Sequence, residues 1–141
     1  MFATQNNVSP ETIPVPARRT GGKILVVDDE ALVRRFIEMS LRSGGYEDVI
    51  FCSSGSGVPL LALGERPQLI IMDVMMPGGN GLRALRILKQ SPGTAGIPII
   101  LTSGFHVLTL EECIQNRVDH LLAKPFTAAQ LLKEVGRLLK E

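Results

Sequence analysis

Acidic residues follow two apolar segments of the chain, where they could bind a metal ion or react with a ligand. Three of them, Asp28–Glu30, come directly after residues 24–27, and Asp73 ends the run 70–72. An apolar run without alternation predicts a strand covered on both faces, and such strands belong to parallel sheets. Open parallel sheets bind and react with ligands at their carboxyl edge. Asp73 is therefore a candidate for chemistry, with an aspartate that only caps a turn as the alternative.

A shared location for these acids predicts a magnesium site. In a flavodoxin-like sheet of order 2-1-3-4-5, the chain reverses direction between strands one and three, which brings Asp28, Asp29 and Asp73 into one crevice. Crowded carboxylates raise one another's pKa unless a cation is present. Mg²⁺ suits a site with few protein ligands, because it retains waters and accepts a phosphate oxygen. Lys124 and Ser103, at neighbouring strand ends, would add a positive charge and a hydroxyl for a phosphoryl group.

The elements that must position these residues alternate along the chain. Strands are predicted over residues 24–27, 48–53, 68–72, 98–101 and 120–123. Two of the helices between them are predicted from residues at helical spacing: Val33, Phe36, Ile37, Ser40 and Leu41, which end at Gly44, and Leu82, Leu85 and Leu88. The other three are predicted from start signals. These are Ser56 as a cap for a helix at 57–63, Thr109 with Glu112 as a capping box, and Thr127 with Gln130 as a second capping box before the apolar stripe of the last helix. This order predicts an α/β fold, a doubly wound five-stranded parallel sheet with five helices on its two faces.

Composition limits the class of protein. The 141 residues, 45% hydrophobic and 21% charged, are enough for one domain with a core. The net charge of +1 gives no global field for nucleic acid or membrane lipid, so direct binding to either is not expected. Cys52 and Cys113 are predicted to be reduced core residues, which fits a cytoplasmic protein without a membrane segment. Residues 1–22, rich in proline and polar residues, are predicted to form a flexible tail before a domain at 23–141.

The chain from Lys23 to Glu141 resembles the receiver domain of two-component response regulators. The resemblance rests on four motifs in order: Asp28-Asp29, Asp73-x-x-Met76-Pro77-x-x-x-Gly81, Ser103-Gly104 and Lys124-Pro125-Phe126. Each motif alone is weak, but their ordered combination at spacings typical of the family is specific. It implies a signalling switch rather than an enzyme.

The resemblance also implies a role for each motif residue. Asp73 would accept a phosphoryl group from a histidine kinase or a histidine phosphotransfer protein, forming an acyl phosphate. Asp29 would bind Mg²⁺ directly and Asp28 largely through water, with Asp73 and the backbone carbonyl of Met75 completing the site. Lys124, which the family typically places before a cis proline, would bind the phosphoryl oxygens, and Ser103 would hydrogen-bond them after transfer.

Some positions depart from the family pattern. Leu121 stands where an aromatic switch residue is usual. Phe105 and Met75 are predicted either to flank the acyl phosphate and control water access or to pack at the rim of the site. The resemblance places a face for a target protein or a dimer on the fourth helix, fifth strand and fifth helix, built from Val107, Leu108, Glu111, Glu112, Leu121, Lys133 and Arg137.

Other functions leave specific traces that can be compared with this sequence. A pseudo-receiver, an interaction module that works without phosphorylation, would normally have lost an acid or the lysine. A Mg²⁺-dependent phosphatase with an aspartyl nucleophile would need a second acid two residues after it, where Met75 stands. A flavodoxin-like carrier would need a phosphate-cradling loop where Asp28–Glu30 would repel FMN. The receiver switch is the favoured interpretation.

Overall fold

The computed structural model describes residues 22–76, 81–104 and 108–140. Its centre is one sheet of five parallel strands: β2 (Ile24–Val27), β3 (Val49–Cys52), β4 (Leu69–Asp73), β5 (Ile99–Ser103) and β6 (His120–Ala123). The strand order is β3-β2-β4-β5-β6, which in chain order is 2-1-3-4-5. The predicted doubly wound flavodoxin-like fold is therefore confirmed, and its reversal point lies between β2 and β4.

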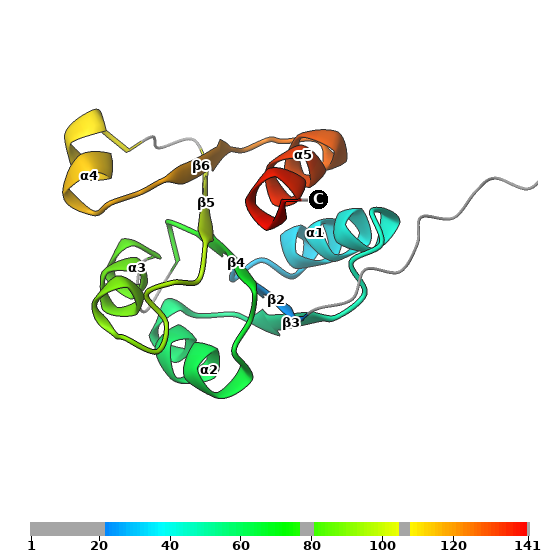
Figure 1. Cartoon of the computed structure of the whole chain (residues 1–141). Helices are drawn as coiled ribbons and strands as arrows, with labels where there is room; N and C mark the ends of the chain where they lie inside the picture. Colours follow the sequence, from blue (N-terminus) through cyan, green and yellow to red (C-terminus); the bar gives the residue numbers. More distant parts are fainter. Residues whose placement is uncertain (1–21, 77–80, 105–107, 141) are drawn as a thin grey trace, which may run out of the picture.

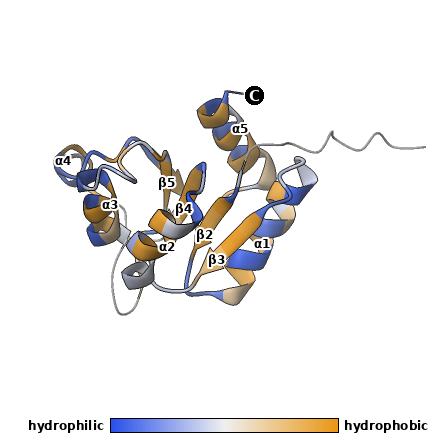
Figure 2. Ribbon diagram, turned by 60° about the horizontal axis from the view of Figure 1, so that its bottom comes forward, coloured by the Kyte–Doolittle hydropathy of each residue, from blue (hydrophilic) through white to orange (hydrophobic). Residues whose placement is uncertain are grey.

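Helices cover both faces of the sheet. In Figure 1, α2 (Val58–Glu65) and α3 (Gly81–Gln90) lie on one face, and α1 (Ala31–Ser43) and α5 (Ala128–Leu139) lie on the other. Successive strand residues divide between two cores, with Leu25 and Val27 packed in the first and Ile24 and Val26 in the second. Figure 2 accordingly shows strands coloured as hydrophobic between helices that carry both polar and apolar residues. The central strands are fully buried because both of their faces are covered.

The short helix α4 (Leu110–Gln115) lies toward the β6 edge of the sheet (Figure 1). Two side-chain pairs join the residues that follow α4 to α3: Arg86 donates to Asn116 at 2.8 Å, and Lys89 lies 3.3 Å from Asp119. The start of α4 is the predicted capping box, with Thr109 and Glu112 bonded reciprocally.

Thr127 and Gln130 form the second predicted capping box, at the start of α5. The predicted end of α1 at Gly44 is also confirmed. A Cβ at Gly44 would lie 2.5 Å from Cδ2 of Leu132, so a side chain there would require the Leu132 side chain of α5 to shift. The ends of these helices are thus fixed by local bonds and by packing between α1 and α5.

The predicted start of α2 is wrong. A 3-10 turn at Gly55–Gly57 precedes the helix, which begins at Val58 after Gly57 without a side-chain cap. The Ser56 hydroxyl lies 2.9 Å from the Ser54 hydroxyl instead. The 3-10 turn thus takes the residues that the sequence assigned to the helix cap.

Phe36 also departs from its predicted place on the buried stripe of α1. The buried residues of α1 are Ile37, Ser40 and Leu41, so Phe36 lies at the margin of that stripe and is exposed. Its ring centroid is 5.9 Å from that of Phe126 at the start of α5. Phe36 therefore belongs to the surface between α1 and α5.

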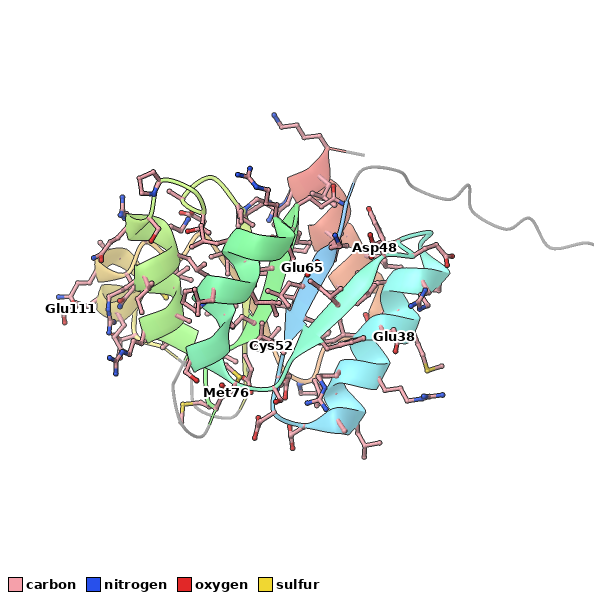
Figure 3. The ribbon with its side chains drawn as sticks, turned by 90° about the horizontal axis from the view of Figure 1, so that it is seen from below. Glu38, Asp48, Cys52, Glu65, Met76 and Glu111 are labelled. Carbon is pink, nitrogen blue, oxygen red and sulfur yellow. The ribbon has the colours of Figure 1, made fainter. Side chains whose placement is uncertain are left out.

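The two cysteines are free and half-buried, as predicted for reduced core residues. The thiol of Cys52 donates to the carbonyl of Ser54 at 3.1 Å, and Cys113 packs against the first core. Figure 3 labels Cys52 at the end of β3 and Asp48 just before its start. In the described ranges, no helix has the length and apolar character needed to cross a bilayer.

Candidate functional site

The carboxyl ends of four strands bring the candidate residues to one edge of the sheet. Asp28 follows β2, and Asp73 and Ser103 are the last residues of β4 and β5. Lys124 follows β6 directly. Parallel pairing aligns Val27 with Met72 and Asp73 with Thr102, so these ends lie at one level. β4 and β5 each run further than predicted because their ladder continues, with the Val74 amide donating to the Thr102 carbonyl at 2.9 Å.

Three carboxylates meet at this edge. Asp28, Asp29 and Asp73 each offer an oxygen, and these oxygens all lie within 4.8 Å of one another. Asp28 is 1% exposed and Asp73 is 5% exposed, whereas Asp29 faces solvent. The predicted crevice is therefore present, and its open side is at Asp29.

Lys124 lies between the two buried acids. Its ammonium nitrogen is 2.9 Å from Oδ2 of Asp28 and 3.4 Å from Oδ2 of Asp73. The Lys124 amide donates to the Ser103 carbonyl at 2.7 Å, and the Lys124–Pro125 bond is cis, as the resemblance implies. The chain after β6 is thus anchored to the end of β5, and the lysine side chain reaches across to the end of β4.

The charges in this crevice change the protonation equilibria of two groups. Burial raises the pKa of Asp73 above its ordinary value of 3.8, and the charge of Asp28 adds to this, although Lys124 acts in the opposite direction. Burial alone would lower the pKa of Lys124, but the hydrogen bond and the charge of Asp28, with that of Asp73, raise it above 10.5. The two shifts have different origins: burial raises the pKa of Asp73 against the effect of Lys124, and the two carboxylates raise the pKa of Lys124 against the effect of burial.

The backbone of Asp73 is fixed by the start of α3. The Gly81 amide donates to the Val74 carbonyl at 2.9 Å. A Cβ at Gly81 would lie 2.3 Å from the carbonyl oxygen of Asp73 and 3.0 Å from Cα of Val74. Only glycine fits this contact, which explains the glycine that follows the Met76-Pro77 turn in the sequence.

Asp28 is bonded at all three of its oxygens. The Glu30 amide donates to Oδ1 at 2.9 Å, Lys124 bonds Oδ2, and Nη1 of Arg34 donates to the backbone carbonyl at 2.6 Å. Sequence reasoning missed Arg34, because its contact depends on how the loop turns into α1. The signal that could have pointed to it is a cationic residue one turn into the helix that follows the acids.

The predicted switch residues lie near this edge, on β5 and β6. Ser103 is buried at the end of β5, and Leu121 on β6 pairs with Leu101 and is 39% exposed. Met75 lies two residues after Asp73, and its side chain is 56% exposed. This exposure is compatible with the predicted position at the rim of the site. Phe105 lies outside the described residues.

One member of the predicted output face is placed wrongly. Leu108 is buried because its side chain packs in the first core, against which Cys113 of α4 also packs. Glu111, Leu121, Lys133 and Arg137 are exposed, Glu112 takes part in the capping box, and Val107 lies outside the described residues. The face is therefore narrower at the start of α4 than the sequence predicted.

The donor set suits a hard divalent cation. Three carboxylate oxygens lie close together, and the exposed side at Asp29 leaves room for coordinated water. Within the part of the chain that the structure describes, this is the only such cluster of acidic, histidine or cysteine side chains.

Comparison with known proteins agrees with this geometry. Residues 24–136 match the family model for the response regulator receiver domain. The chain belongs to the response regulator receiver family. Receiver domains are signalling domains of two-component systems, so the predicted class is confirmed.

The curated relatives of this receiver domain are longer regulators. It is 31% identical over 121 residues to the phosphate regulon transcriptional regulatory protein PhoB of Pseudomonas aeruginosa, covering 85% of this chain and 52% of that protein. It is 36% identical over 119 residues to the probable transcriptional regulator ycf27 of Pyropia yezoensis, covering 84% of this chain and 47% of that protein. The chain thus spans about half the length of these relatives.

Solved receiver structures match over their full length. A putative response regulator from Chloroflexus aurantiacus superposes with a TM-score of 0.78 at 27% identity, covering 86% of this chain and 100% of that one. The receiver domain of the sensor histidine kinase PA1611 from Pseudomonas aeruginosa gives a TM-score of 0.77 at 30% identity, with the same coverage. That second structure holds a magnesium ion coordinated in its active-site cleft.

Proposed function

We propose that this receiver domain is a phosphoryl-accepting signalling switch in which Asp73 takes a phosphoryl group from a histidine of a partner protein. The observation that carries the proposal is the cluster of Asp28, Asp29 and Asp73 around the ammonium of Lys124. A pseudo-receiver that had lost phosphorylation would not need to keep this arrangement. We take residues 23–141 as the domain and 1–22 as a tail.

In the transfer, a carboxylate oxygen of Asp73 attacks phosphorus, the bond to the histidine nitrogen breaks, and the imidazole leaves with the electron pair. The product is an acyl phosphate on Asp73 and a free histidine on the partner. Lys124 already lies 3.4 Å from Asp73, so its charge can stabilise the phosphoryl oxygens. Ser103, at the end of the next strand, would donate its hydroxyl to the attached group.

Mg²⁺ is the cofactor that we propose for this site. Asp29 and Asp73 would bind it directly, Asp28 largely through water, and the Met75 backbone carbonyl would complete the protein ligands. When bound, the ion supplies positive charge beside the phosphoryl oxygens. Met75, which is exposed beside Asp73, would limit water access to the acyl phosphate, with Phe105 as its predicted counterpart.

We propose that the phosphodonor is a histidine kinase or a histidine phosphotransfer protein that covers the α1 surface beside the site. An apolar pocket of about 440 Å³ lies there, lined by Leu32, Val33, Phe36, Pro125 and Phe126 with Lys124 at its border. Asp73 is almost buried, so a macromolecular donor must come close to this surface in order to reach it. Contact with exposed apolar side chains would hold the donor in place.

The output would pass to a protein target or a second receiver through α4, β6 and α5. Leu121, Glu111, Lys133 and Arg137 are the exposed residues of this face. The relative PhoB is a transcriptional regulatory protein, but this chain spans only about half of its length. We propose that the receiver itself acts through protein contacts and does not bind nucleic acid directly.

The test is incubation with acetyl phosphate and Mg²⁺, followed by intact mass measurement. The wild-type protein should gain one phosphoryl group, and chelation of the metal should prevent the gain. Asp73→Asn should remain folded and gain none. Equal labelling of wild type and Asp73→Asn would refute the assignment, and no labelling of either would favour the pseudo-receiver.

A further inference from the structure

The loop between β2 and α1 carries two of the three carboxylates but has few bonds of its own. Asp28 is tied to the sheet through its amide, which donates to the Cys52 carbonyl at 3.2 Å. Glu30, at the start of α1, makes no side-chain capping bond, and the first turn of the helix holds no acidic residue. Asp29 itself faces solvent. The Glu30 amide donates to Oδ1 of Asp28 across Asp29 at 2.9 Å, and a contact at the peptide between Asp28 and Asp29 would act together with this bond in setting the direction of the Asp29 side chain.

Arg34 supplies such a contact from one turn inside α1. Its Nη1 donates to the Asp28 carbonyl at 2.6 Å, while its own amide donates to the Glu30 carbonyl at 3.1 Å. The Asp28 carbonyl belongs to the planar peptide unit that joins Asp28 to Asp29. A bond to this oxygen therefore fixes the plane from which the Asp29 side chain extends.

We propose that Arg34 is a positioning residue that orients Asp29, and with it the carboxylate cluster, for Mg²⁺. This inference rests on the proposed function of the site. Arg34 bonds a backbone carbonyl rather than a carboxylate of the cluster, so it acts by fixing the loop. Groups that orient metal ligands in this way affect metal affinity strongly, although they never touch the ion.

Charge and position predict opposite effects when Arg34 is replaced. A guanidinium beside a cation site repels the ion, so the loss of its charge alone would strengthen Mg²⁺ binding. The loss of the bond to the Asp28 carbonyl would free the loop and weaken binding, by about tenfold for a contact of this type. The sign of the change therefore separates the two explanations.

Arg35 provides a matched control, because it carries the same charge on the same helix and is exposed to solvent. Mg²⁺ affinity would be measured by isothermal titration calorimetry for wild type, Arg34→Met and Arg35→Met. We expect about a tenfold loss of affinity for Arg34→Met. Arg35→Met should bind as wild type does or slightly more tightly. Wild-type or tighter binding by Arg34→Met would overturn the proposal.

Arg34→Lys covers the case in which Arg34→Met does not fold. Lysine keeps the charge but is shorter and lacks the planar fork of the guanidinium, so its affinity for Mg²⁺ should fall between those of Arg34→Met and wild type. Unchanged affinity in Arg34→Lys would then overturn the proposal.

A second readout needs neither metal nor phosphate. Amide hydrogen exchange at Asp29 and Glu30 in the metal-free protein should be faster in Arg34→Met, or in Arg34→Lys, than in Arg35→Met. Equal rates in these variants would show that Arg34 does not hold the loop. Because neither measurement uses phosphorylation, a wild-type protein that binds Mg²⁺ but accepts no phosphoryl group would refute the proposed function and leave this inference standing.

Discussion

Gly81 packs so closely on Asp73 that a Cβ at position 81 would lie 2.3 Å from the Asp73 carbonyl oxygen. The carboxylate at the centre of the site is thus placed by a contact between the start of α3 and the end of β4. Backbone atoms on both sides of the contact leave no flexible side chain that could move away. The position of Asp73 and the stability of the domain therefore depend on the same residue.

Gly81→Ala should destabilise the domain by about 1–3 kcal/mol, because overpacking a rigid contact forces a backbone shift. Urea denaturation would measure this loss, and labelling by acetyl phosphate should slow in parallel. Gly136→Ala is the control, since a Cβ at Gly136 in α5 meets no atom within 4 Å. That variant should be slightly more stable than wild type, because alanine favours a helix over glycine. Equal effects of the two substitutions would contradict the steric argument.

Asp73→Asn should stabilise the metal-free protein at neutral pH. Burial raises the folded-state pKa of Asp73 above 3.8, so its contribution to stability is present below 3.8 and is lost as the pH rises through the raised pKa. Asparagine does not ionise and avoids this loss. The difference in the free energy of unfolding between the variant and wild type should therefore shrink as the pH falls toward 3.8. Denaturation in EDTA at a series of pH values would test it. A less stable variant at neutral pH would mean that the pairing with Lys124 outweighs burial.

Mg²⁺ should raise the melting temperature of the wild-type domain, because a ligand that binds only the folded state stabilises it. Open carboxylate sites of this kind need on the order of millimolar metal. Asp29→Asn should lose most of the gain, since Asp29 is the acid that faces solvent. Sodium chloride at matched ionic strength is the control for screening. An unchanged wild-type melting temperature in Mg²⁺ would count against the metal site.

Leu32→Glu should impair transfer from a protein donor without affecting a small one. Leu32 is 83% exposed on α1 and lines the apolar pocket beside Lys124. A charge there should slow phosphotransfer from a phosphorylated histidine phosphotransfer domain by about tenfold, the effect of 1.4 kcal/mol at a contact surface. Labelling by acetyl phosphate should not change.

Leu60→Glu is the control for that experiment, because Leu60 is similarly exposed on α2, which covers the other face of the sheet. It should transfer as wild type does. Equal slowing of both variants would mean that the donor does not select the α1 surface.

An acyl-phosphate mimic on Asp73 should slow amide exchange from Leu108 to Cys113 more than around Leu121. Ser103 lies at the end of β5, from which the chain leads into α4, so an inward pull on Ser103 acts there first. Leu121 carries no aromatic ring that would have to swing inward, so its surroundings should rearrange less. Protection that instead maps to α1 would show that the output face is misplaced.

Local signals in the sequence predicted local structure well. The Thr109 and Thr127 capping boxes and the limits of β6 depend on neighbouring residues, and all three are confirmed. The meeting of Asp28, Asp29 and Asp73 followed from strand order, which alternating strands and helices constrain. The prediction that Ser56 caps α2 was wrong, because a 3-10 turn and an α-helix share the same start signals and Ser56 lies inside a 3-10 turn.

Contacts made by folding the chain back on itself were not predictable. Leu108 is apolar in a loop, and only the packing under α4 shows that it is buried. Arg34 donates to a backbone carbonyl six residues earlier, and a cationic residue one turn into the helix indicates such a contact without establishing it. The roles of both residues depend on the path of the backbone in the folded domain.

The exposure of Asp29 has a consequence for kinetics. Asp28 and Asp73 are buried and paired with Lys124, whereas Asp29 faces solvent, so an arriving ion meets Asp29 first. Within the described residues, no strand or helix covers Asp29, which faces solvent. Metal exchange should therefore be fast compared with phosphoryl transfer, and the lifetime of the signal would be set by the acyl phosphate rather than by the ion.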